Sequence, residues 1–224
     1  MRLGWLALCG VFVASDLMAQ DEATVPPEPG VTSEVASETE LSQDGDDAAF
    51  KVAVQAVRDK QFRNAVDLFL PLAENDEADA QFNLAYLLRL GLGRPQNYGE
   101  AYFWASLSAL GGEERAVDLV EDLQALLPDK QREAVVKSLQ DRLSKQIESG
   151  DDSAPEKLGR VYADFAVKPD MENAFVWFSI CHALGKLTCE DGMARAIEDM
   201  PPEAIVKVQT KAAEVFANSA FAGP

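Results

Sequence analysis

Apolar residues recur three or four positions apart from Ala48 onward, and no stretch of this region alternates apolar and polar residues as a strand would. The clearest stripes are Ala116, Leu119, Val120, Leu123, Leu126 and Leu127; then Val135, Leu139, Leu143 and Ile147; then Ile205, Val208, Ala212, Val215 and Phe216. Short breaks with Gly, Asn, Asp or Pro separate the stripes, and short links favour antiparallel neighbours. The pattern predicts an all-α chain of about ten helices, paired as hairpins near 48–75, 78–111, 113–149, 154–185 and 188–219.

An internal repeat runs through this helical region. Shifting the sequence by 73 residues brings Trp104 onto Trp177. The same shift pairs Ala101 with Ala174, Ser106 with Ser179, Gly112 with Gly185, and Leu127-Pro128 with Met200-Pro201. We infer that a four-helix unit was duplicated behind one further helix pair. Repeats of this size indicate stacked helix pairs, because one pair alone cannot bury its apolar face.

The stretch ADAQFNLAYLLRLGLGRPQNYGEAYFWASLSALGG places small, glycine and aromatic residues at characteristic positions: Ala80, Gln81, Leu84, Gly91, Gly93, Ala101, Trp104, Ser108, Ala109 and Gly112. It resembles the Sel-one-like repeat, a relative of the tetratricopeptide repeat. The second copy keeps Leu158, Gly159, Tyr162, Ala174, Trp177 and Gly185. The resemblance implies a right-handed α-solenoid with repeats near 48–77 (partial), 78–112 and 154–189. The extra helices at 113–149 and 188–219 resemble extensions that follow such repeats.

Packing accounts for most of these repeat positions. We expect Trp104 and Trp177 to fill the core between neighbouring helices. Gly91 and Gly93 suit a chain that leaves a helix through left-handed conformations. The second copy has Phe165 and Val167 where the repeat has its turn glycines, and these side chains resist a positive φ. Its turn is therefore predicted to adopt another conformation.

The first residues have the layout of an export signal. Arg2 precedes an apolar stretch from Leu3 to Val13, which is too short to span a bilayer, and small residues follow. We expect a signal peptide at 1–19 that is cleaved after Ala19, or less favourably after Ser15. The protein would then be exported, and in a Gram-negative cell it would be periplasmic.

The chain is strongly acidic, with a formal net charge of −18. Residues 21–47 hold nine acidic residues and no basic one. We expect 20–47 to be a disordered linker, acting either as a spacer or as a docking arm, in front of a repeat domain at 48–224. The acidity disfavours nucleic acid and anionic membranes as partners, because both would be repelled. No segment after the signal predicts stable membrane insertion.

Cys181 and Cys189 remain after the expected cleavage, in a compartment where disulfides persist. They flank a short turn at Gly185, which would bring them close enough to bond. Their spacing also resembles that of cysteine-rich members of the same family, in which a bridge ties one repeat to the next. Two unpaired buried thiols, or chemistry with the neighbouring His182, are the alternatives. Adjacent helical residues do not face each other, which disfavours a Cys–His catalytic pair. The resemblance places an alanine at the position of His182, so we expect His182 to be a partly buried, hydrogen-bonded structural residue.

The sequence contains no phosphate-binding loop, metalloprotease motif or nucleophile elbow. We therefore predict no catalytic residue, no cofactor and no metal ligand. The resemblance implies an exported scaffold or adaptor that binds another protein in the cell envelope, and the sequence does not identify that partner or its contact residues. The alternatives are a hydrolase acting on cell wall or β-lactams, a ligand-binding protein, or a structural part of an envelope machine.

Overall fold

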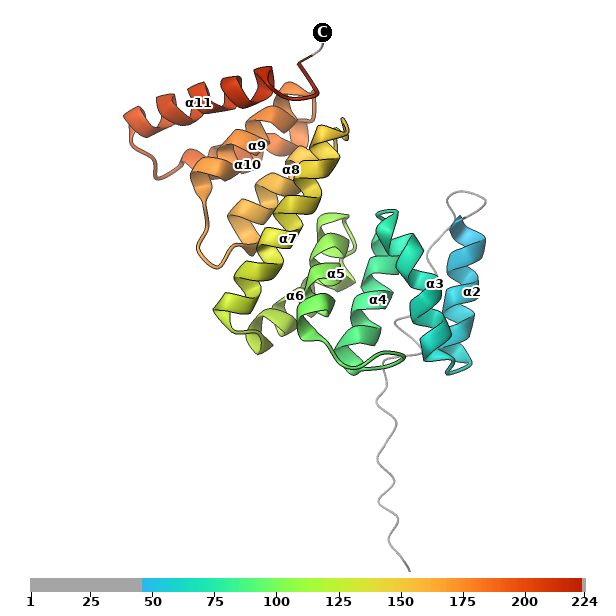
Figure 1. The fold of residues 1–224 in the computed structure, drawn as a ribbon. Helices are drawn as coiled ribbons and strands as arrows, with labels where there is room; N and C mark the ends of the chain where they lie inside the picture. Colours follow the sequence, from blue (N-terminus) through green and yellow to red (C-terminus); the bar gives the residue numbers. More distant parts are fainter. Residues whose placement is uncertain (1–45, 223–224) are drawn as a thin grey trace, which may run out of the picture.

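The computed structural model describes residues 46–222, in which ten α-helices follow one another in chain order and no residue belongs to a strand (Figure 1). The elements are α2 (Asp46–Arg58), α3 (Phe62–Glu74), α4 (Ala78–Leu90), α5 (Tyr98–Leu110), α6 (Arg115–Leu126), α7 (Asp129–Glu148), α8 (Ala154–Arg160), the π-helical turn η1 (Val161–Phe165), α9 (Met171–Ala183), the 3-10 turn η2 (Leu187–Cys189), α10 (Glu190–Ile197) and α11 (Pro202–Ala217). The all-α fold predicted from hydrophobic spacing is confirmed, and it is consistent with the solenoid that the resemblance implies.

The predicted signal peptide at 1–19 lies outside the described residues, as does the predicted linker up to residue 45. Helix α2 begins at Asp46, two residues before the expected start of the repeat domain. Among the helices between residues 46 and 222, none has the length and apolarity needed to cross a bilayer.

The duplication is visible in the helix boundaries. Helix α5 spans 98–110 and α9 spans 171–183, so both ends differ by the 73 residues of the sequence repeat. Helices α7 and α11 begin at the matching residues Asp129 and Pro202. Each is preceded by a proline with extended backbone, Pro128 with ψ 148° and Pro201 with ψ 153°.

Three of the five expected hairpins form as predicted, because α2 packs on α3, α4 on α5, and α8 on α9. The other two expectations, at 113–149 and 188–219, were wrong in their pairing. Helices α6 and α7 both pack on α5 and contact each other little, and α10 and α11 both pack on α9. The cause is the extended backbone at Pro128 and Pro201, which redirects the chain instead of folding it straight back.

Buried polar side chains tie neighbouring helices together, between helix pairs at Gln81 and within one pair at Ser108. The Gln81 amide nitrogen donates to the Ala73 carbonyl oxygen at 3.0 Å, and only 2% of Gln81 is exposed. The Ser108 hydroxyl donates to the Ala78 carbonyl oxygen at 2.7 Å. Each bond adds a side-chain donor to a backbone carbonyl near a helix end. These contacts explain why the repeat has a polar residue at two positions of its core.

The first turns of the two copies differ, as Phe165 and Val167 predict. In the first copy Gly91 and Gly93 have φ of 70° and 81°. A Cβ on Gly93 would overlap the Phe62 carbonyl group, so this turn needs glycine for space as well as for φ. In the second copy the chain passes through the π-helical turn η1, Phe165 is buried, and no residue from 161 to 170 has a positive φ.

Candidate interaction site

The structure places most of the predicted repeat positions in the core. Ala80, Leu84, Ala101, Trp104, Leu158, Gly159 and Ala174 are buried, and Tyr162 is partly buried. Gly112 and Gly185 lie in exposed turns with φ of 96° and 88°. The buried positions hold the helices together and leave little of their side chains available for binding.

Trp177 is the exception among these positions. It was expected in the core, yet the structure leaves it only partly buried, whereas 6% of its counterpart Trp104 is exposed. Trp177 lines a groove of about 810 Å³. The groove is formed by Ser144, Ile147 and Glu148 of α7, Trp177 of α9, and Glu214, Val215, Asn218, Ser219 and Ala220 of α11 and the residues after it. It therefore combines an aromatic ring with two carboxylates and no basic side chain.

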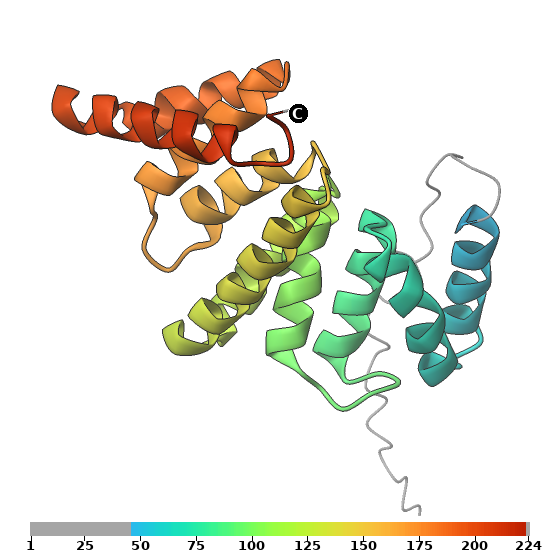
Figure 2. The same cartoon turned by 45° about the horizontal axis from the view of Figure 1, so that its top comes forward.

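The positions of three helices create this groove. The C-terminal ends of α7 and α11 lie near each other in both views (Figures 1 and 2), and α11 packs on α9. Ile147 is 5% exposed and closes the groove towards the core, while Glu148 and Glu214 are exposed. Among residues 46–222, neither of these carboxylates has an ion-pair partner.

The first copy shows what covers the equivalent tryptophan. The Arg142 guanidinium of α7 lies 5.9 Å from the centroid of the Trp104 ring. The same guanidinium donates to the Asp76 carboxylate and to the Glu74 carbonyl oxygen, each at 2.8 Å. Arg142 therefore bridges an aromatic face and a carboxylate in the turn before α4, which is a favourable setting for a cation.

In the second copy the residue equivalent to Arg142 is Val215, 73 positions later. The turn that holds Asp76 corresponds to the end of α7, where Glu148 provides a carboxylate. In the part of the chain from 46 to 222, arginines lie over the rings of Phe82 and Trp104, and no cation lies over Trp177. The second copy thus keeps the ring and a carboxylate and lacks the internal cation.

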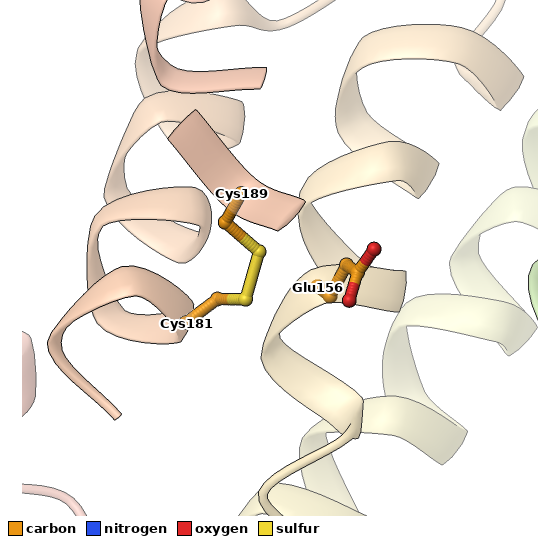
Figure 3. A group of neighbouring side chains, drawn as sticks. All are labelled: Glu156, Cys181 and Cys189. Atoms are coloured by element: carbon orange, nitrogen blue, oxygen red, sulfur yellow. A yellow bond between two sulfur atoms is a disulfide. The ribbon is translucent and has the colours of Figure 1, made fainter. Parts of the chain in front are cut away.

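The two late cysteines meet near the C-terminal end of α9. Cys181 and Cys189 form a disulfide with their Cα atoms 6.2 Å apart, and both are buried. Glu156 of α8 lies beside the bridge (Figure 3), and its carboxylate lies within 4.8 Å of both sulfur atoms. Two cysteines and a carboxylate are a set that could hold a metal ion, but the sulfurs of a disulfide are poor ligands because thiolates bind metal.

His182 is a partly exposed residue at the end of α9. Its Nδ1 atom lies 3.8 Å from the Glu190 carboxylate, which is too far for a hydrogen bond, and Nδ1 has no other partner. The expected partial burial is present, and the hydrogen bond expected for its imidazole is absent at this atom. Its side chain does not take part in the groove around Trp177.

A second group of charges links α4 to the start of α6. Arg115 forms ion pairs with Asp79 and with Glu113, and its guanidinium carbon lies 4.6 Å from the Phe82 ring centroid. Burial, together with the neighbouring Glu113 carboxylate, raises the pKa of Asp79 to about 6. Hydrogen bonds from Arg115 lower the pKa of Glu113 to about 2. One guanidinium therefore serves two carboxylates, and Asp79 is the one that binds a proton first.

Comparison with known families agrees with the repeat architecture. The Sel1 repeat family matches residues 78–113 and 157–180, which cover α4–α5 and most of α8–α9. The chain contains two Sel1-like repeats. No curated protein matches it. The partial copy expected at 48–77 lies outside both matched ranges, although α2 and α3 form a helix pair there.

Beside these Sel1-like repeats, the groove is the feature that sequence reasoning missed. The repeat pattern correctly gives the helix on which Trp177 lies but not its exposure, because α11 determines how much of the ring is covered. The 73-residue alignment does contain a signal of the groove, because Arg142 in the first copy is replaced by Val215 at the matching position of the second copy. Sel1 repeats are consistent with a scaffold for protein–protein interaction.

Proposed function

We propose that this protein is an exported, non-catalytic adaptor that binds another protein in the cell envelope. The observation that supports it most directly is the groove around Trp177. A partly exposed aromatic ring that shares a groove with two carboxylates without ion-pair partners is a surface suited to a partner, since tryptophan is enriched at the energetic centres of protein interfaces. A solenoid of helix pairs is also a fold that typically presents extended binding surfaces.

The proposed export rests on the sequence. The layout of residues 1–19 is that of a cleavable signal, and the disulfide between Cys181 and Cys189 suits an oxidising compartment. The net charge of −18 makes a neutral or basic protein a better partner than a nucleic acid or an anionic membrane. Together these features favour the envelope as the site of action.

Affinity capture tests the adaptor role. The tagged protein is crosslinked in its native cells, captured from the periplasmic fraction and examined by mass spectrometry. We expect one envelope protein to be enriched and to be displaced by an excess of untagged chain, which serves as the specificity control. Recovery of no protein above that control would contradict the adaptor role.

The intact mass of the chain from the same fraction tests export. We expect a mature chain that begins at Gln20 and is two hydrogens lighter than its reduced form, because one disulfide is present. A chain that stays in the cytosol with residues 1–19 attached would contradict the proposed localisation.

A further inference from the structure

We propose that the groove between α7, α9 and α11 binds an arginine side chain of the partner, with the guanidinium over the Trp177 ring and paired with Glu148 or Glu214. This inference rests on the proposed adaptor function and names the chemistry by which the partner is recognised. The ligand class is an exposed protein segment that carries an arginine between apolar residues.

The first repeat copy is the internal template for this proposal. There, Arg142 lies over the Trp104 ring and donates to the Asp76 carboxylate, so the chain itself provides the cation. In the second copy Val215 stands in the place of Arg142. The ring and a carboxylate are retained while the cation is not, so a cation from another molecule would complete the same arrangement.

The remaining lining residues fit an arginine with apolar neighbours. Ile147 and Val215 provide an apolar wall against which the methylene groups of the side chain can pack. Glu148 and Glu214 provide the carboxylates, and a planar guanidinium can bond a carboxylate while it stacks on an aromatic ring. Since no Lys or Arg lines the groove, no internal cation competes for these groups.

Binding can be followed at the Trp177 indole in the full chain, purified as the cell processes it. The indole NH signal is assigned in a ¹H–¹⁵N correlation spectrum by its loss in Trp177→Phe. The probe is a short blocked peptide with one arginine flanked by leucines. The matched peptide has citrulline in place of arginine, which keeps the shape and removes the charge. We expect a saturable shift of the Trp177 signal with the arginine peptide and a response at least about tenfold weaker with citrulline.

Two variants test the assigned groups. Val215→Arg introduces the residue of the first copy, and we expect it to occupy the groove and abolish the peptide response. The double variant Glu148→Gln/Glu214→Gln should weaken binding by about tenfold or more. Its matched control is Glu133→Gln/Glu203→Gln, which makes the same charge change on the same two helices at positions outside the groove. This control should bind the arginine peptide as the parent does.

The outcomes separate this proposal from the adaptor function. No shift of the Trp177 signal, or equal shifts with both peptides, overturns the arginine site. Unchanged binding in Val215→Arg also overturns it. If affinity capture recovers the same envelope protein with the parent and with Val215→Arg, the adaptor function stands and the groove is not its contact. Loss of that protein in Val215→Arg, with retention in the Glu133→Gln/Glu203→Gln control, supports both.

Discussion

Asn97 and Asp170, 73 residues apart, cap the N-termini of α5 and α9 in the same way. The Asn97 Oδ1 atom accepts a hydrogen bond from the Glu100 backbone NH at 3.1 Å, and the Asp170 Oδ1 atom accepts one from the Asn173 NH at 3.0 Å. The duplicated unit therefore retains its capping interaction although the capping residue has changed. Both helices carry the aromatic residue of their repeat, so these caps support the two helices around which the copies are built.

Removal of either cap should destabilise the protein. We expect Asn97→Ala and Asp170→Ala each to lower the free energy of unfolding by about 1 kcal/mol, because each leaves a helix-end NH without its partner. Urea unfolding followed by circular dichroism measures the change. The exchanges Asn97→Asp and Asp170→Asn keep a capping oxygen and should cost much less. If Asp170→Asn costs as much as Asp170→Ala, charge rather than capping explains the effect.

The Phe178 ring lies between two glycines, and this contact should be sensitive to a single methyl group. A Cβ on Gly159 would lie 2.8 Å from the ring, and one on Gly192 would lie 2.9 Å from it. We expect Gly159→Ala to destabilise the protein by about 1–3 kcal/mol, since the packed ring must move. Gly99→Ala is the control, because the nearest atom to its added Cβ is 3.6 Å away.

A double-variant cycle tests the cause of that loss. Phe178→Leu removes part of the ring, so Gly159→Ala should cost less in this background than in the parent. Unfolding free energies that add without any coupling would show that the glycine acts through backbone flexibility and not through its contact with the ring.

The disulfide should stabilise the second copy. Replacing both Cys181 and Cys189 by Ala is expected to lower the free energy of unfolding by about 2–3 kcal/mol, from the chain entropy that the closed loop removes from the unfolded state. Thermal and urea unfolding of the variant and the oxidised parent give the comparison. Alkylation of both thiols in the folded, exported protein without any reductant would show that the bridge does not form there.

Glu156 should slow reduction of this disulfide. Its carboxylate lies close to both sulfurs, so it repels an incoming thiolate and disfavours the thiolate that leaves. We expect Glu156→Gln to be reduced severalfold faster by dithiothreitol at constant pH, as measured by quenched alkylation. Glu121→Gln, an exposed residue of α6, is the control. An unchanged rate in Glu156→Gln would contradict the electrostatic effect.

Stability should depend on pH through Asp79. Its pKa is about 6 in the folded protein and has an ordinary value of 3.8, so between about pH 4 and 6 the folded state binds more protons than the unfolded state. The contribution of Asp79 therefore falls as pH rises through this range. Glu113 acts in the opposite sense, because its lowered pKa stabilises the fold above its ordinary value of 4.5 and this stabilisation is lost as pH falls towards 2.

The variant Asp79→Asn isolates the first effect. We expect the unfolding free energy of the variant to rise relative to that of the parent as pH rises from 4 to 6. Above pH 6 the difference should stay constant. Urea unfolding at half-unit pH steps measures it. A difference that does not vary over this range would show that Asp79 titrates at its ordinary pKa.

Much of the fold follows from the sequence because local physical rules decide it. Helical spacing of apolar residues gives the helices, and the 73-residue offset gives the duplication. The glycines of the first turn and their replacement by Phe165 and Val167 correctly predict two different turns. The packing of α6 and α7 on α5, and of α10 and α11 on α9, could not be read in this way, because a short link does not show the direction in which an extended proline sends the chain.

The sequence by itself determined the helices, the repeat register and most of the residues that belong to the core of each copy. Only the tertiary structure decided which of the two tryptophans is covered. Trp104 and Trp177 occupy the same repeat position, and the residue 38 positions further along each copy is Arg142 over the first ring and Val215 in the groove beside the second. Exposure depends on how helices distant in sequence pack, and so a groove between α7, α9 and α11 exists only once all three are in place.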